Sequence, residues 1–385
     1  MRSAFLLRPD VVYLNHGSYG ACPAVVFERY QAWQRELESE PVEFLGRRFG
    51  SLMRRARTDL ADYVGADPED IAFVHNATTA INTVAQSLAL QPGDEILSTN
   101  LEYGALDRAW AAVCSRTGAR YIRQPISLPV TDRADLVEEI WSGFNERTRV
   151  LYLSHITSAT GVRLPVEALI TRAKDEGLVV VVDGAHAPGQ IPLNLEDLGA
   201  DFYTGNCHKW MMTPKGCAFL YARREAQEKL RTLIVSWGDV AESDSSFIRE
   251  FEYQGTNDIS AFLSVSAAIR FMRENSWDNV RTSCHELVNV YRAGMRGITG
   301  LPSLTPDTSE WYAQLSAHPM PPCDGPAFQR ALFEEYGIEI PVMNGPNGEH
   351  YLRISVQGYN TRDDVDRLLG AVRALLPQFA EIAAS

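Results

Sequence analysis

Four consecutive valines at positions 179–182 follow Leu178 and precede Asp183. A continuous apolar run of this kind predicts a strand that is buried on both faces, as in parallel sheets. Further apolar runs predict strands at 71–74, up to about Thr99, and at 119–124, 149–154 and 201–203. Apolar positions at helical spacing predict helices at about 25–37, 42–64, 80–90, 106–117, 133–144, 166–177 and 261–274. Strands and helices therefore alternate, which predicts βαβ units and a mostly parallel sheet in an α/β fold.

The two ends of the chain follow a different pattern. Residues 301–326 are rich in proline, serine and threonine, which predicts loops around a short strand near 312–316. Residues 11–14 predict a short strand at the N-terminus, and 15–20 predict a turn-rich loop. The remaining elements expected are a helix at 327–336, a loop at 341–349, a strand at 351–356 and a closing helix capped by Thr361.

A chain of 385 residues is long enough for two domains, or for one large domain with a smaller lobe. We expect a large domain at residues 21–262 and a small domain that combines residues 1–20 with 263–385. No apolar run approaches membrane-spanning length, and the N-terminus has only four consecutive apolar residues, too few for a secretion signal. The protein is therefore expected in the cytoplasm, away from membranes.

The charge and the cysteines exclude several classes of function. A net charge of −13 argues against binding to nucleic acid or to an anionic membrane, because both require basic patches. The six cysteines show neither a CxxC pair nor any zinc-ligand spacing, so no metal site is expected. Reduced thiols in a cytoplasm are the simplest interpretation of them.

Two residues near the valine run suggest a specific chemistry. Asp183 stands where the strand should end, and ligands of open α/β sheets lie beyond the carboxyl ends of strands. Lys209 lies between His208 and Trp210. Considered alone, Asp183 is more simply a loop cap and Lys209 a solvated amine. Together they match pyridoxal phosphate (PLP), because an acid can hold a pyridine nitrogen protonated and a lysine can form a Schiff base with an aldehyde.

The surrounding motifs carry a family resemblance. D-G-A-H-A-P-G-Q at 183–190 and D-F-Y-T-G-N-C-H-K-W at 201–210 resemble the core of the class V aminotransferase family, and most closely its isopenicillin N epimerase-like branch. The resemblance extends from Y-L-N-H-G at 13–17 to R-I-S at 353–355 and Y-N-T at 359–361. It implies fold type I, in which a large domain with a mostly parallel sheet carries a smaller α+β C-terminal lobe.

The junction between the expected strand at 71–74 and the next helix predicts a phosphate site. Helix N-termini present unpaired N–H groups and the positive end of a dipole, and Thr78 and Thr79 add hydroxyl donors. An ordinary threonine cap is the alternative, since the chain has neither a Walker A motif nor GxGxxG. The family holds its cofactor phosphate at this junction, so the resemblance favours the phosphate site.

Other site residues are implied by the resemblance. Tyr103 matches the ring that stacks on the pyridine; many members carry histidine there, and core packing is the alternative role. Ser158, where relatives often have asparagine, would contact the phenolic oxygen. The remaining cofactor contacts implied are His186 near the ring, His208 at the phosphate, and Gly255–Thr256, which would reach the partner's phosphate across a homodimer interface.

The resemblance also places the substrate. Arg353 matches the anchor of the α-carboxylate, for which a guanidinium fork is suited. Asn15 and His16 lie in a loop expected to shape the substrate pocket. Solvated or structural roles are the alternatives for these residues.

The reaction is predicted from the number of bases it needs. Lys209 would bond to the cofactor and act as acid and base at Cα, while Asp183 keeps the pyridine nitrogen protonated. Epimerisation needs a base on each face of Cα, and Tyr103 is the sole candidate for the second; β-elimination needs one. The branch also resembles C–S lyases of secondary metabolism, such as lincosamide-pathway enzymes that process cysteine S-conjugates.

We therefore predict C–S bond cleavage of a cysteine S-conjugate by a PLP-dependent enzyme. The alternatives are decarboxylation-coupled oxidative deamination, epimerisation and transamination. A catalytically silent PLP-fold protein would lack the lysine, and a nicotinamide-dependent dehydrogenase would carry the glycine-rich fingerprint that this chain does not have.

Overall fold

The structure is a computed structural model that describes residues 1–241 and 243–380. Its main sheet confirms the predicted α/β fold. The seven strands run in the order β2-β8-β7-β6-β5-β3-β4, and every neighbouring pair is parallel except the two that involve β8. Their bounds are β2 Ile71–Val74, β3 Glu95–Thr99, β4 Arg120–Gln124, β5 Thr148–Ser154, β6 Val179–Asp183, β7 Phe202–Asn206 and β8 Ala218–Ala222.

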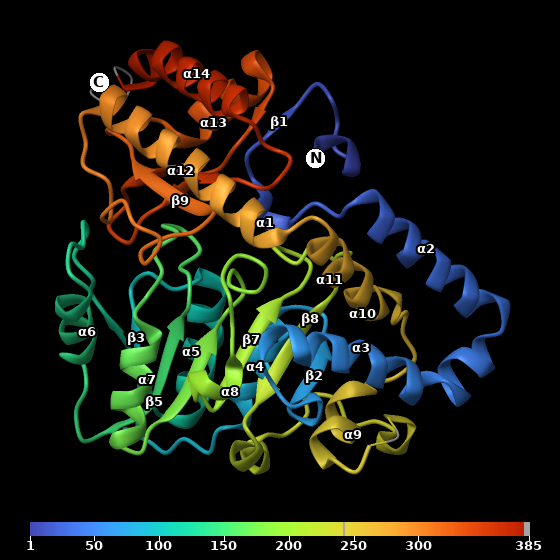
Figure 1. The fold of residues 1–385 in the computed structure, drawn as a ribbon. Coiled ribbons are helices and arrows are strands. Elements are labelled where there is room, and N and C mark those ends of the chain that lie inside the picture. The colour runs from blue at the N-terminus through green and yellow to red at the C-terminus, as the bar shows by residue number, and fades with distance from the viewer. Residues whose placement is uncertain (242, 381–385) are drawn as a thin grey trace.

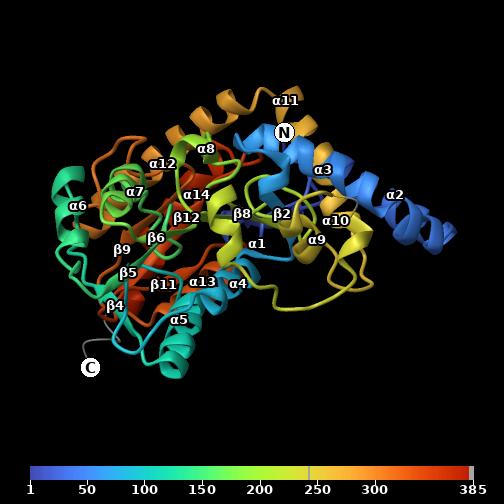
Figure 2. The same ribbon diagram turned by 90° about the horizontal axis from the view of Figure 1, so that it is seen from below.

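Helices cover both faces of this sheet (Figures 1 and 2). One face carries α4 (Ala77–Ser87) and α5 (Gly104–Thr117), whose apolar side chains join those of α9 (Ser246–Glu252) in one buried cluster. The other face carries α3, α6 and α7. The valines of β6 are buried between the two layers, as the uninterrupted apolar run predicted. The bounds on the second face are α3 Phe49–Val64, α6 Arg133–Trp141, α7 Val166–Asp175 and the short α8 Leu195–Leu198.

A second lobe lies over the carboxyl-end edge of the sheet (Figure 1). Its antiparallel sheet has the order β11-β12-β9. The lobe also receives the N-terminus, because β1 (Val12–Tyr13) pairs in parallel with β10 (Ile338–Glu339). Its other elements are α12 Trp277–Thr299, α13 Gly325–Tyr336, α14 Arg362–Ala380, β9 Leu315–Pro319, β11 Val342–Asn344 and β12 His350–Ser355.

Further helices connect the two lobes. Both α10 (Ser260–Leu263) and α11 (Val265–Glu274) pack against α2 (Ala24–Ser39) and α3. The division of the chain at residue 262 stays a prediction. Short 3₁₀ turns occupy Arg2–Ala4, Pro68–Asp70, Arg224–Lys229 and Gly238–Ala241.

Several local predictions were wrong. Residues 15–20 form not an open loop but a short helix, α1 (His16–Tyr19), and the loop expected at 341–349 begins with β11. The helix expected at 42–64 is divided into a π-helical turn at Glu43–Arg47 and α3. The helix expected from residue 80 starts at Ala77, because the Asn76 side chain caps it by accepting the N–H of Thr79 at 2.8 Å.

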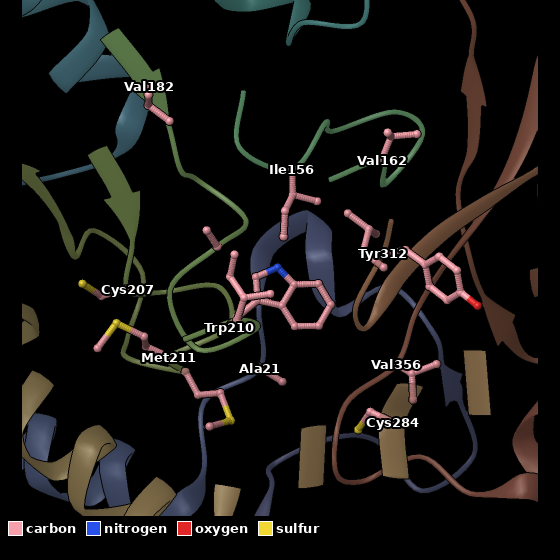
Figure 3. Close-up of a cluster of buried hydrophobic side chains, with 14 of the residues drawn as sticks. Ala21, Ile156, Val162, Val182, Cys207, Trp210, Met211, Cys284, Tyr312 and Val356 are labelled. Carbon is pink, nitrogen blue, oxygen red and sulfur yellow. The ribbon is translucent and has the colours of Figure 1, made fainter. Parts of the chain in front are cut away.

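A buried cluster joins the lobes around Trp210 (Figure 3). Val182 and Ile156 reach it from the main sheet side, and Tyr312 and Val356 from the second lobe. All of these residues are at most 4% exposed, so the contact between the lobes is dry at this point. The packing fixes the segment that follows β7 and carries Lys209.

Candidate active site

The carboxyl ends of five strands meet at one edge of the main sheet, under the second lobe. A cavity of about 170 Å³ opens there. Residues that follow β2, β3, β5, β6 and β7 all contribute to its walls, as expected for an open α/β sheet. The lining residues are Ser18, Tyr19, Asn76, Ala77, Thr78, Tyr103, Leu106, Ser154, Ile156, Ser158, Asp183, Ala185, His186, Asn206, His208 and Lys209.

Asp183 and Lys209 share this cavity, as the sequence predicted. Asp183 is 4% exposed, and within the described residues its side chain accepts one hydrogen bond, from the N–H of Ala185 at 2.9 Å. Burial raises the pKa of its carboxyl. Burial also lowers the pKa of the Lys209 amine to about 8. The charge of Asp183 opposes this shift, and the charge of Arg353 adds to it. A lysine with this pKa is partly neutral near physiological pH and can act as nucleophile or base.

His186 bridges Lys209 to the buried cluster. Its Nε2 lies 3.2 Å from Lys209 Nζ, and its Nδ1 accepts the indole N–H of Trp210 at 3.2 Å. Burial, with the positive charges of Lys209 and Arg353, holds the pKa of His186 well below its usual value, so the ring is neutral. His186 lines the cavity, and its contact with the cofactor ring stays a prediction. The sequence gave no sign of its contact with Trp210.

The N-terminus of α4 offers part of an anion site. The Thr78 hydroxyl and N–H have no hydrogen-bond partner in the described part of the chain, and the residue lines the cavity. Thr79 is placed differently: its N–H and hydroxyl both go to Asn76 Oδ1, so it serves the cap that we considered as the alternative. Asn206 accepts the N–H of Ala77 at 2.9 Å and so fixes the helix end against β7.

His208 lines the cavity beside Lys209. Its Nδ1 donates to the carbonyl of Cys217 at 2.9 Å, which leaves Nε2 as the free ring nitrogen. Burial lowers its pKa to about 4. An anion at Nε2 would raise that pKa and allow the ring to donate a second hydrogen bond.

Tyr103 and Ser158 also reach the cavity. Tyr103 precedes the first turn of α5 and is 46% exposed, so it is not a core residue. Ser158 lines the wall and presents its carbonyl to Arg353. Behind Tyr103, the buried carboxyl of Glu102 accepts hydrogen bonds from Ser154 and Thr99, and burial raises its pKa to about 8.

Arg353 does not line the cavity itself but bonds to Ser18 and Ser158, which do. Its guanidinium is 2% exposed and donates to the Ser158 carbonyl at 2.7 Å and to Ser18 Oγ at 2.9 Å. No carboxylate of the described residues pairs with it, its Nε–H has no acceptor, and burial lowers its pKa to about 10. A buried guanidinium without an anion favours an anionic ligand nearby. Asn15 is its neighbour, with Oδ1 at 3.4 Å from Nη2.

His16 does not face the cavity. It is fully buried, with Nδ1 3.0 Å from the Tyr359 hydroxyl and Nε2 3.0 Å from the Lys209 carbonyl. Burial lowers its pKa to about 3. We correct our expectation of a substrate ligand: His16 holds the backbone of Lys209, because both ring nitrogens are already engaged.

Thr256 is exposed and lies outside the cavity of its own chain. Gly255 before it has φ +106°, in the region that favours glycine. A role at a partner's phosphate stays a prediction.

The comparisons with known proteins agree with this geometry. The model of the family described as Aminotransferase class-V matches residues 12–368. The chain belongs to the class-V aminotransferase family. It is 36% identical to isopenicillin N epimerase of Streptomyces clavuligerus over 389 residues, 97% of each chain. It is 29% identical to putative L-cysteine desulfhydrase 1 of Oryza sativa subsp. japonica, over 95% of this chain and 83% of that protein.

Among solved structures, the cysteine desulfurase CsdA of Escherichia coli aligns with a TM-score of 0.82 at 25% identity, over 98% of each chain. This class-V aminotransferase therefore has the predicted fold type I and is a PLP-dependent enzyme. The residues present fit the cofactor. The buried carboxylate of Asp183 accepts one hydrogen bond and matches the ring nitrogen. The Lys209 amine, with its lowered pKa, matches the aldehyde, and the free donors at the N-terminus of α4 match the phosphate.

Asn76, Asn206 and Ser154 are cavity residues that we did not predict. Asparagine and serine after a strand are common in any turn, so nothing marked these positions in advance.

None of the described helices is long and apolar enough to cross a membrane.

Proposed function

We propose that this enzyme cleaves the Cβ–S bond of a cysteine S-conjugate by β-elimination, with Lys209 as its base. The supporting observation is that the two histidines of the cavity wall are weak bases. Burial holds the pKa of His186 well below its usual value and lowers that of His208 to about 4. Among the described residues that line the cavity, Lys209 is the one basic group with a pKa near neutrality, at about 8. A reaction with one base suits this site.

The cofactor, when bound, withdraws electrons from Cα of the amino acid. Asp183 would hold the proton on the ring nitrogen, because its carboxylate has one hydrogen bond and room for another. Lys209 Nζ would take the proton from Cα, and the electron pair of the Cβ–S bond would leave with sulfur as a thiolate. Hydrolysis of the remaining fragment releases pyruvate and ammonia.

The cysteines favour release of a free thiol over transfer of sulfur to the protein. A persulfide can form only on a thiol that the substrate reaches, and none of the six cysteines lines the cavity. Cys207 and Cys217 are fully buried, and Cys22 lines a separate pocket.

The other cavity residues would hold the cofactor, and Arg353 would attract the substrate. Thr78 and His208 would hold the phosphate, with Thr79 shaping the helix end, and Tyr103 would stack on the ring above Ser158. Arg353 would attract the substrate carboxylate to the wall formed by Ser18 and Ser158, since it has no anion of its own.

We further propose a homodimer in the cytoplasm. Residues 233–237 form an exposed apolar patch, in which Trp237 is 79% exposed. A patch of this kind favours a protein partner; its apolar members are Leu233, Ile234, Val235 and Trp237. In this homodimer, Thr256 would contact the partner's phosphate, as the family resemblance implies. Six free cysteines fit a reducing compartment.

Incubation with cysteine S-conjugates tests the reaction. Thiol and pyruvate in equal amounts are expected, and Lys209→Ala should form neither. Carbon dioxide with an aldehyde would select the oxidative deamination instead. A keto acid formed only with added amino acceptor would select transamination.

Epimerisation is the second candidate. The phenols of Tyr19 and Tyr103 line the cavity, and either could serve the face of Cα opposite Lys209. Isopenicillin N epimerase is also among the more similar relatives. Deuterium exchange at Cα with inversion and no cleavage would select it. The double variant Tyr19→Phe/Tyr103→Phe would then abolish inversion, whereas a β-elimination would persist.

A further inference from the structure

Trp210 is the residue next to Lys209, and the proposed function does not use it. The indole is fully buried at the centre of the cluster between the lobes (Figure 3). Its Nε1–H nevertheless has an acceptor, His186 Nδ1 at 3.2 Å. The other ring nitrogen of that histidine lies 3.2 Å from Lys209 Nζ. The indole is thus connected to the amine through one imidazole.

The contact with Trp210 determines which nitrogen of His186 carries the proton. An indole N–H can only donate, so Nδ1 must present a lone pair. The ring is buried and neutral, and a neutral imidazole then carries its hydrogen on Nε2. The side of His186 that faces Lys209 is therefore an N–H donor. A free amine can accept this bond, whereas an ammonium would face it with a second donor.

We propose that Trp210 is a positioning residue that, through His186, presents a hydrogen-bond donor to Lys209 Nζ and so favours the neutral amine. This role for the amine rests on the proposed function, but the tautomer of His186 does not. One consequence is that His186 cannot take a proton from Cα, because Nε2 already holds one.

The charges around Lys209 oppose one another, whereas those around His186 act in one direction. Lys209 faces Asp183, which favours the ammonium, and Arg353, which opposes it. His186 faces Lys209, Arg353 and His16, and all three keep its ring neutral. Its backbone is held by Gln190, whose side-chain amide donates to the His186 carbonyl at 2.6 Å. The position of the ring is therefore set independently of its protonation.

Nitrogen NMR of histidine-labelled enzyme, loaded with cofactor, tests the tautomer directly. The signals of His186 are those that vanish in His186→Gln. We expect a protonated Nε2 and an unprotonated Nδ1 from pH 6 to 8. A proton on Nδ1, or a doubly protonated ring in this range, would overturn the proposal whether or not the enzyme cleaves C–S bonds.

Trp210→Phe tests the effect on Lys209, and the chain offers a matched control. Trp110 is equally buried, but its Nε1–H has no hydrogen-bond partner within the described residues, so Trp110→Phe removes similar bulk without a hydrogen bond. The pH at which the Lys209 amine titrates is followed by nitrogen NMR of lysine-labelled, cofactor-free enzyme, in which the signal of Lys209 is the one that Lys209→Ala lacks. It should rise by about one unit in Trp210→Phe, the equivalent of one hydrogen bond, and stay constant in Trp110→Phe.

Equal shifts in the two variants, or none in either, would refute the role of Trp210. The NMR signals of His186 should also become a mixture of tautomers in Trp210→Phe. If that variant does not fold, the wild-type tautomer still decides the proposal.

Discussion

Lys209→Met should stabilise the cofactor-free protein while it abolishes turnover. The pKa of the Lys209 amine is lowered by burial from 10.5 to about 8 in the folded chain. Below pH 8 the folded state therefore carries the full cost of a buried ammonium, and above pH 10.5 it carries none. A difference of about 2.5 units corresponds to about 3 kcal/mol of unfolding free energy, at ~1.36 kcal/mol per unit.

Urea unfolding of the cofactor-free wild type and variant checks this magnitude. We expect Lys209→Met to gain about 3 kcal/mol at pH 7, and the gain to shrink towards zero between pH 8 and 10.5. Lys229→Met is the control, because Lys229 is exposed and its removal should change stability by less than about 0.5 kcal/mol. A gain of the same size at pH 7 and pH 10.5 would mean that methionine merely packs better, and no gain at pH 7 would refute the cost of the charge.

Three further predictions follow from the site. Asp183→Asn should keep the far-UV circular dichroism of the wild type but lose kcat by orders of magnitude, since a neutral amide cannot hold a proton on the ring nitrogen; an unchanged kcat would make Asp183 structural. Arg353→Ala should raise KM for the amino acid by the equivalent of about 2–5 kcal/mol without weakening cofactor binding, and equal substrate affinity in a titration would place the carboxylate elsewhere. Thr256→Val should weaken cofactor binding without changing the dimer in light scattering, and unaltered affinity would contradict a contact across the interface.

The sequence predicted the main sheet well because its local signals agree with the final packing. The valines of β6 are buried on both faces, which is the environment that an uninterrupted apolar run requires. We did not predict α12, although its buried residues Trp277, Cys284, Val288, Tyr291 and Met295 recur at helical spacing, so this signal was present in the sequence. The antiparallel direction of β8 was invisible, because direction depends on the turn at 207–217 rather than on the strand.

In the candidate site, too, some residues could be predicted from the sequence and others could not. Asp183 and Lys209 could be predicted because the chemistry of one cofactor requires both residue types, and the cavity brings them together. The structural role of His16 could not be predicted, because its partners Tyr359 and Lys209 lie 343 and 193 positions away in the sequence. Nothing in a short motif distinguishes a histidine that contacts a ligand from one that supports the backbone of a reactive lysine.

The attachment of residues 12–20 has a consequence for biosynthesis. This segment contacts both lobes: β1 pairs with β10, His16 bonds to Tyr359 and to Lys209, and a Cβ at Gly20 would lie 2.1 Å from the His208 carbonyl. Its partners at 338–360 are synthesised more than 300 residues later. The main sheet can form during synthesis, but the N-terminal segment that supports the Lys209 loop is fully anchored only after Tyr359 is made, so chains truncated before this residue should fold without a completed site.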